Sequence, residues 1–323
     1  MRFVFVMDPM DRLVPDKDTT VAFLHAAQGR GHASLHCEPR DLYLKDGDVY
    51  ARVRDVSVSA TAPFFALGSP VDVRIADVQA VFIRKDPPFD AQYLYLTLML
   101  ERARDRTVLM NDPRGLRDAN EKLYTTHFAR HMPRTLVTSN KQRILDFVAE
   151  LGGEAVIKPL DGAGGAGVLL IGLADKNTRS IIDILTRDGA ALAMVQQYLP
   201  AVREGDKRVL LLDGEILGAI NRVPRADDLR SNIHVGGRVE KTEVTPTERA
   251  IIEDIAPRLS RDGLYFVGLD LIGGKLTEVN VTSPTGIQEL SQHTGVRVSD
   301  RVIEWVERRA TDYRPDLRSI PAP

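Results

Sequence analysis

The sequence of 323 residues has a single cysteine, almost no net charge and no long apolar run. Cys37 alone cannot form a disulfide within the chain, which favours a reducing compartment. The net charge of −2 gives no electrostatic reason to expect nucleic acid or an acidic membrane as a partner. No stretch reaches the ~20 apolar residues that a membrane-spanning helix needs. The apolar residues 3–7 end at Asp8 without the cleavage site of an export signal, so we expect a cytoplasmic globular protein.

Short apolar stretches alternate with helical patterns in the first third of the chain. Strands are predicted at residues 3–7, 34–37, 80–84 and 107–110, and helices at 17–28 and 91–104. Strands that alternate with helices are typical of a parallel α/β sheet. Residues 43–58 instead predict a hairpin that turns at Asp46-Gly47.

The rest of the chain predicts two further units built around strand pairs. In residues 120–200 we expect helices at 121–128, 141–151 and 177–186, and strands at 135–138, 155–158, 168–171 and 193–197. Beyond them we expect strand pairs around Asp213-Gly214 and at 266–280, and helices at 247–261 and 297–309. The predicted units are therefore 1–119, 120–200 and 201–311, followed by a loose tail at 312–323.

The predicted strand pair at residues 266–280 carries acidic and amide side chains among apolar ones. Glu278 and Asn280 are two residues apart on one strand, so they face the same side of the sheet. If the strands pair across Gly273-Gly274, Asp270 lies close to Glu278. Such oxygens suit Mg²⁺, and polar groups that face inward on apolar strands require a reason. From these residues alone, a metal site and an ordinary surface hairpin are equally good interpretations.

A glycine-rich turn, GAGGAG at residues 162–167, separates two predicted strands. The residues match the G-x-G-x-x-G pattern of dinucleotide-binding proteins, but that pattern lies between a strand and a helix. No Lys-Ser or Lys-Thr pair follows, so the turn is not a Walker A loop either. Its backbone N–H groups can still cover phosphates, with Lys158 beside them as a point charge. Taken alone, a flexible turn with a surface lysine is the more frequent case.

Two further features favour a nucleotide site. Lys122, at the start of the middle unit, is a second candidate for binding phosphate. The strand that ends in Gln196-Gln197-Tyr198-Leu199 offers backbone groups to an adenine edge, with Leu199 packing on the ring. Each feature is more often structural when it stands alone. Together with the glycine-rich turn and the acidic strand pair, they predict a site for ATP.

These motifs resemble the bacterial glutathione synthetases of the ATP-grasp superfamily. The resemblance runs from MDPMDR near the N-terminus to about Arg309, through RKDPPFD, KPLDGAGGAGV, QQYLP, GDKRVLLLDGE and VGLDLIGGKLTEVNVTSPTGIQE. It implies an α/β protein of the ATP-grasp fold, with an N-terminal parallel α/β domain, a central α+β lid domain and a C-terminal catalytic domain. It also implies an activity: the ATP-dependent joining of γ-glutamylcysteine and glycine to give glutathione, ADP and phosphate through an acylphosphate.

The resemblance assigns catalytic and metal-binding roles to residues of this chain. Arg208 and Arg222 match basic positions near the reacting groups, and Arg208 is our choice for stabilising the tetrahedral oxyanion. Asp270, Glu278 and Asn280 are expected to hold two Mg²⁺ ions, with Mn²⁺ as the alternative metal.

The same resemblance assigns the contacts of ATP and the substrates. ATP is expected to contact Lys122, Lys158, Gly162, Gly164, Gly165, Gln196, Gln197, Tyr198, Leu199 and Asp206. The other substrates are expected to contact Arg84, Asp86, Arg230, Arg238, Ser283 and Thr285. Arg84 ends a predicted strand of the first sheet, where open α/β sheets bind ligands, so we expect it to receive the dipeptide's carboxylate.

Residues 223–238 form a polar loop with Gly236-Gly237 as a hinge. An acylphosphate hydrolyses when water reaches it, so a closing lid is preferred here over a disordered solvent loop. His234-Val235 stands where the family often has Ala-Ala, a difference that bears on the loop's contacts.

The expected partners are small molecules and further copies of the chain, because the family is often tetrameric; neither nucleic acid nor a membrane is expected. Two alternatives stay open at this point. One is a related ATP-grasp ligase with another acceptor amino acid, and the other is a nucleotide-binding regulator that does not catalyse a reaction.

Overall fold

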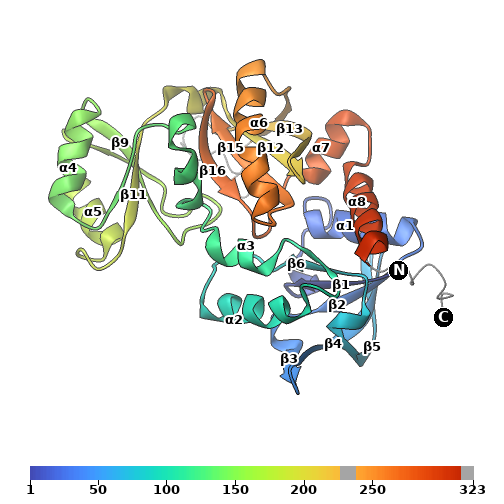
Figure 1. The fold of residues 1–323 in the computed structure, drawn as a ribbon. Helices are drawn as coiled ribbons and strands as arrows, with labels where there is room; N and C mark the ends of the chain where they lie inside the picture. The colour runs from blue at the N-terminus through green and yellow to red at the C-terminus, as the bar shows by residue number, and fades with distance from the viewer. Residues whose placement is uncertain (226–237, 314–323) are drawn as a thin grey trace.

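The computed structural model describes residues 1–225 and 238–313 (Figure 1). Within these residues the strands form three sheets, which belong to residues 2–110, 135–197 and 206–280. Helices pack on each sheet, so the α/β class predicted from the sequence is confirmed. Across residues 1–225 and 238–313, no helix has both the length and the apolar character that crossing a bilayer requires.

The first sheet has a parallel half and an antiparallel half. The parallel strands, all predicted, are β1 (Arg2–Met7), β2 (Ala33–Cys37), β6 (Ala80–Arg84) and β7 (Val108–Met110). The antiparallel strands are β3 (Leu42–Lys45), β4 (Asp48–Val58) and β5 (Phe65–Arg74). β3 and β4 form the predicted hairpin, and Asp46 and Gly47 both take a positive φ at its turn. The parallel strands and the hairpin predicted for this part of the chain therefore belong to one mixed sheet.

β5, like β14 (Arg238–Lys241) of the third sheet described below, was not predicted from the sequence. Its side chains are mostly exposed, and it contains Gly68 and Pro70, so it lacks the apolar alternation that predicts a strand. It nevertheless pairs with β4 along most of its length, from Arg74 opposite Tyr50 to Phe65 opposite Val58.

Helices cover both faces of the parallel half. Phe3 and Phe5 of β1 pack with α1 (Thr19–Gly29) and α8 (Val298–Tyr313), whereas Val4 and Val6 pack toward α2 (Ala91–Leu100). This is the alternation of a strand that is buried on both faces. α8 packs on α1 (Figure 1) and also reaches the third sheet, where Trp305 Nε1 donates to Asp213 Oδ2 over 3.1 Å. The helix that was expected to close the third unit therefore also contacts the first.

The second sheet is antiparallel and small. Its order is β10 (Leu169–Gly172), β9 (Glu154–Pro159), β11 (Ala193–Gln197) and β8 (Thr135–Thr138). α4 (Lys141–Glu150) and α5 (Thr178–Thr186) cover one face and share a core with the strands. These elements lie where they were predicted, but the helix expected at 121–128 is a 3₁₀ helix at Tyr124–His131 with a kink at Phe128.

The third sheet is also antiparallel, in the order β14 (Arg238–Lys241), β13 (Glu215–Val223), β12 (Asp206–Leu212), β15 (Phe266–Ile272) and β16 (Lys275–Asn280). α6 (Pro246–Arg261) packs on one face, and its first turn has a capping box between Thr245 and Glu248. α7 (Ile287–Thr294), which was not predicted, and α8 follow β16.

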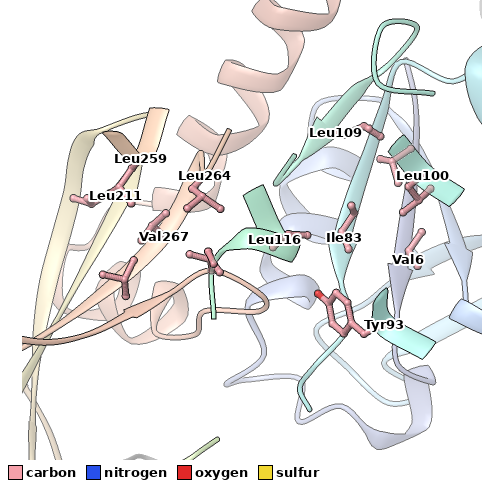
Figure 2. Packing of buried hydrophobic residues seen from close by; sticks show 14 of the residues in the cluster. Val6, Ile83, Tyr93, Leu100, Leu109, Leu116, Leu211, Leu259, Leu264 and Val267 are labelled. Carbon is pink, nitrogen blue, oxygen red and sulfur yellow. The ribbon is translucent and has the colours of Figure 1, made fainter. Parts of the chain in front are cut away.

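The first and third sheets share one hydrophobic core. Leu116, on α3 (Pro113–Asp118), lies between Ile83 of the first sheet and Val267 of the third (Figure 2). Because apolar side chains run continuously from one sheet to the other, the edges where the two sheets meet are held in a fixed relation.

Candidate active site

The β15–β16 hairpin places three polar side chains next to one another. Asp270 lies opposite Glu278, and Gly268 lies opposite Asn280. Gly273 and Gly274 form the turn, with φ of +55° and +72°. Asn280 Nδ2 donates to Asp270 Oδ2 over 3.1 Å. The hairpin geometry predicted from the sequence is therefore present.

Asp270 accepts hydrogen bonds from two guanidinium groups. Arg208 Nε lies 2.5 Å from Oδ1 and Arg208 Nη2 lies 3.0 Å from Oδ2, while Arg222 Nη2 lies 2.9 Å from Oδ1. Arg222 also donates to Asp206 Oδ2 over 2.6 Å. Burial alone would raise the pKa of Asp270, but the charges of Arg208 and Arg222 outweigh it and hold this pKa well below its usual range. The group is therefore a buried, ionised carboxylate.

Two lysines converge on β16. Lys122 Nζ lies 3.0 Å from Glu278 Oε1 and also donates to the Gly162 carbonyl. Lys158 Nζ lies 3.3 Å from the Thr277 carbonyl oxygen. Burial lowers the pKa of Lys158, because a charged ammonium loses water contacts there. An anion beside these two ammonium groups would replace part of that lost solvation.

The glycine-rich turn joins β9 to β10 and lies beside Lys122, which donates to the Gly162 carbonyl. Gly164 and Gly165 take φ of +61° and +81°, a region that other residues rarely adopt. A Cβ on Gly162 would lie 2.8 Å from the carbonyl oxygen of Ala166, so a side chain does not fit there. The turn thus brings bare backbone close to Lys122.

A cavity of about 140 Å³ lies between the second and third sheets. We call it the first cavity. It is lined by every residue for which an ATP contact was expected: Lys122, Lys158, Gly162, Gly164, Gly165, Gln196, Gln197, Tyr198, Leu199 and Asp206. Asp270 and Glu278 also line it. Residues that are far apart in sequence therefore meet in one place.

A second cavity of about 410 Å³ lies beside the first. Of the residues with expected roles in catalysis, metal binding or substrate binding, it is lined by Asp86, Arg208, Arg222, Glu278, Asn280, Ser283 and Thr285. Burial raises the pKa of Asp86, and a hydrogen bond from Ser283 partly counters this effect. Gly164, Gly165 and Glu278 line both cavities, so the two share a wall.

The remaining expected substrate contacts are not brought together. Arg84 is buried and lines neither cavity; it donates to Thr20 Oγ1 and to the Pro284 carbonyl, both over 3.1 Å. Arg238 begins β14 and pairs with Glu240 at the surface. Arg230 and the Gly236-Gly237 hinge lie outside the described residues, as does most of the tail expected to be loose.

Five charged residues in the wall of the second cavity were not predicted from the sequence: Arg12, Lys17, Asp18, Glu121 and Glu289. The first three follow the carboxyl end of β1, and this position in an α/β sheet was the available signal. Glu121 directly precedes Lys122, but nothing in its sequence neighbourhood indicates where its side chain points.

The residues near Glu278 suit a hard divalent cation. In the described part of the chain no group of three or more His, Cys, Asp or Glu residues is placed to hold a metal ion. The candidate set here is two carboxylates, Asp270 and Glu278, with the amide of Asn280. Asn280 Nδ2 donates to Asp270 and to the Gly268 carbonyl, which fixes the amide orientation and leaves Oδ1 for another partner. An all-oxygen set of this kind fits Mg²⁺ when phosphate oxygens complete it.

Two family models match the chain. The model of the N-terminal domain of prokaryotic glutathione synthetase matches residues 1–117, and that of its ATP-grasp domain matches residues 121–295.

Full-length relatives carry the same description. A glutathione synthetase of Thermosynechococcus vestitus is 44% identical over 317 residues, which cover 95% of this chain and 99% of that protein. One of Salmonella typhimurium is 41% identical over 307 residues, with 94% and 97% covered.

Solved structures share the fold at low identity. The D-cycloserine synthetase DcsG superposes with a TM-score of 0.64 at 18% identity, over 95% of this chain and 100% of that chain. The ATP-grasp ligase PsnB, complexed with a precursor peptide and AMPPNP, gives 0.62 at 17% identity, over 96% and 98%.

Proposed function

The chain belongs to the prokaryotic glutathione synthetase family, and from this membership and the two cavities we propose how its residues divide the reaction. The protein is an ATP-grasp ligase that forms glutathione from γ-glutamylcysteine and glycine, with ATP converted to ADP and phosphate. As an ATP-grasp ligase, it uses ATP and a divalent metal ion.

ATP binds in the first cavity, which we now call the nucleotide cavity. This assignment is supported by the lining of the cavity, because every residue expected to contact ATP lies in its wall. The cavity also shares Glu278 and the glycine-rich turn with the second cavity. The strand end at Gln196–Leu199 receives the adenine, and Lys122 and Lys158 lie toward the phosphates. The shared wall then brings the γ-phosphate to the border between the cavities.

The dipeptide binds in the second cavity, which we now call the dipeptide cavity. A carboxylate is a poor acyl donor, so the γ-phosphoryl group is first transferred to the carboxylate of the cysteinyl residue. Lys122 and Lys158 offset the negative charge on the phosphate oxygens in this step. The amine of glycine then attacks the acylphosphate carbon, and phosphate leaves.

Arg208 and Arg222 act on the acyl-transfer side. Both are buried, and Asp270 fixes their guanidinium groups in the wall of the dipeptide cavity. The tetrahedral oxyanion is stabilised by Arg208, because a donor that is already oriented and desolvated does not reorganise during the reaction. Arg222, which contacts the same carboxylate of Asp270 as Arg208, adds a second positive charge.

Asp270, Glu278 and Asn280 would hold two Mg²⁺ ions, with Mn²⁺ as the alternative metal. A divalent ion supplies charge neutralisation on phosphate oxygens. Glu278 lies in the wall common to both cavities, at the border where the γ-phosphate would lie. We further propose a cytoplasmic homo-oligomer, on the basis of the family resemblance.

The test is a substrate panel. Purified protein is incubated with ATP, Mg²⁺, several γ-glutamyl dipeptides and several amino acids, and ADP release is measured together with the ligated product. We expect release that requires γ-glutamylcysteine and glycine together. Release with another acceptor amino acid, or none with any pair, would contradict the assignment.

A further inference from the structure

The chain leaves the third sheet after Asn280, and residues 281–285 run along the dipeptide cavity. We call these residues the 281–285 segment. Thr282, Ser283, Pro284 and Thr285 line the cavity. β16 ends at Asn280, and among the described strands none pairs with the segment. Val281 and Thr282 are nevertheless buried, so their backbone groups need hydrogen-bond partners from elsewhere.

Glu121 supplies these partners at the start of the segment. Its Oε1 accepts from Val281 N over 2.9 Å, from Thr282 N over 3.1 Å and from Thr282 Oγ1 over 2.9 Å. A single carboxylate oxygen thus holds two consecutive amides and one hydroxyl. Burial and the charge of Glu278 raise the pKa of Glu121, and the three hydrogen bonds partly counter this shift. Three hydrogen bonds to one oxygen tie the backbone at Val281 and Thr282 to this side chain.

Three other side chains hold the carbonyls of the same segment. Asn111 Nδ2 donates to the Val281 carbonyl over 2.8 Å. Arg84 donates to the Pro284 carbonyl and Arg208 to the Thr285 carbonyl, each over 3.1 Å. The segment is therefore positioned by side chains from the first sheet, the middle unit and β12. Other walls of the site are instead held by the hydrogen bonds between paired strands.

Glu121 also lies next to the nucleotide cavity. Its carbonyl oxygen accepts from Val279 N over 3.2 Å, within β16. The next residue, Lys122, pairs with Glu278 and donates to Gly162 of the glycine-rich turn. The pair Glu121-Lys122 therefore contacts the 281–285 segment with one side chain and the phosphate end of the nucleotide cavity with the other.

We propose that Glu121 is a positioning residue that sets the 281–285 segment for dipeptide binding. The proposal rests on the proposed function only in naming the dipeptide as the ligand; the contact with the segment does not depend on it. Glu121 acts through Val281 and Thr282, so its loss moves the cavity wall but leaves the adenine-binding strand in place.

The test uses two substitutions and one matched control. Glu121→Ala removes all three hydrogen bonds, whereas Glu121→Gln keeps a carbonyl oxygen that can accept them. Glu248→Ala is the control, because Glu248 is a buried carboxylate that pairs with Lys207 and caps α6, without touching either cavity. KM for γ-glutamylcysteine, kcat and the dissociation constant of ADP are measured for each variant.

We expect Glu121→Ala to raise KM for γ-glutamylcysteine by at least about tenfold, equal to ~1.4 kcal/mol, with ADP binding within about twofold of the wild type. Glu121→Gln should recover most of the loss, and Glu248→Ala should lower the melting temperature without changing this KM. An unchanged KM in Glu121→Ala, or equal losses for the dipeptide and ADP, would overturn the proposal.

Hydrogen exchange separates this inference from the proposed function. The amides of Val281 and Thr282 should exchange faster in Glu121→Ala than in the wild type, and at nearly the wild-type rate in Glu121→Gln. If the wild type makes no glutathione, the proposed function fails while the exchange result still decides the positioning role. Unchanged exchange in Glu121→Ala would refute that role even in an active enzyme.

Discussion

The nucleotide cavity and the dipeptide cavity share Glu278 but are held by different kinds of contact. The walls of the nucleotide cavity are hairpins, β9–β10 and β15–β16, whose backbones are fixed by strand ladders. The wall of the dipeptide cavity at residues 281–285 pairs with none of the strands in residues 1–225 and 238–313 and is held by side chains from distant elements. A substitution in the nucleotide cavity removes a group from a wall that its strands still hold, whereas one behind the 281–285 segment also removes a hydrogen bond that holds the backbone.

The largest effect is expected where both kinds of contact meet, at Arg208. Arg208→Leu leaves Asp270 buried with one guanidinium fewer and frees the Thr285 carbonyl. Breaking a buried ion pair typically costs ~3–5 kcal/mol of stability. For Arg208→Leu we expect a lower urea midpoint of unfolding and no measurable turnover. Arg208→Lys keeps the charge, so it should restore more of the stability than of the turnover. A stable, active Arg208→Leu enzyme would remove the basis for its role.

The next effect concerns the shared wall. Glu278→Gln keeps the shape of the side chain but removes the charge that faces Lys122. We expect kcat to fall by about 10²–10³-fold, the usual cost of losing one electrostatic contact at a reacting centre. Glu278 is partly exposed, so the melting temperature should change little. Normal turnover in this variant would contradict both the assignment of Glu278 as a metal ligand and the proposal that the reaction takes place at the wall shared by the two cavities.

Lys158→Met tests the nucleotide cavity by itself. The ammonium lies beside β16 without a carboxylate partner within ion-pair distance among the described residues, so its loss affects the bound phosphate most. A charged hydrogen bond contributes ~1.5–3 kcal/mol, so ATP affinity should fall by about 10–100-fold. KM for γ-glutamylcysteine should stay near the wild-type value. A parallel loss of dipeptide affinity would erase the distinction between the cavities.

Arg84→Lys should weaken dipeptide binding and leave ATP binding unchanged, the opposite of Lys158→Met, and its effect should be smaller. Lysine keeps the charge between the rings of Phe23 and Phe266 but cannot reach both Thr20 and Pro284 in the same geometry. Lysine can keep one of the two charge-assisted hydrogen bonds, so the loss should stay below the ~1.5–3 kcal/mol of a full one, and KM for γ-glutamylcysteine should rise by about fivefold. ATP affinity should be unchanged. If Arg84 instead binds the dipeptide directly, as expected from the sequence, a much larger loss will appear.

The smallest effect is expected far from both cavities. Glu307 on α8 pairs with Arg30 at 2.6 Å and with His32 at 2.5 Å. The hydrogen bond from Arg30 lowers the pKa of Glu307 below its ordinary value of 4.5, so the contact stabilises the fold above pH 4.5 and is lost as pH falls further. Glu307→Gln should lower stability by less than about 1 kcal/mol at neutral pH, because the pair is near the surface. The difference should vanish in acid, and neither KM should change.

The nucleotide cavity was predictable because regular strands carry its residues. The spacing of Glu278 and Asn280 placed both on one face, and the Gly273-Gly274 turn brought Asp270 opposite Glu278, as the register confirms. Lys158 and the glycine-rich turn followed from the strand pair around them. Local pattern determines local pairing here, so the sequence was sufficient.

The dipeptide cavity was less predictable because its contacts join residues far apart in the chain. Arg84 contacts Pro284, 200 residues away, and Glu121 contacts Val281, 160 residues away. No periodic pattern encodes which units pack together, so neither the contact of Glu121 with Val281 nor that of Arg84 with Pro284 could be predicted. The antiparallel strand β5 was missed for a different reason, since its exposed face carries no apolar alternation.

Oxygen transfer between the substrates tests most directly whether the two cavities form one active site. γ-Glutamylcysteine labelled with ¹⁸O in its cysteinyl carboxylate is incubated with ATP, Mg²⁺ and glycine, and the phosphate product is examined by ³¹P NMR. If the phosphoryl group crosses from the nucleotide cavity to the dipeptide in the adjoining one, each phosphate carries one ¹⁸O atom from the dipeptide. Phosphate free of ¹⁸O, formed together with glutathione, would contradict this account.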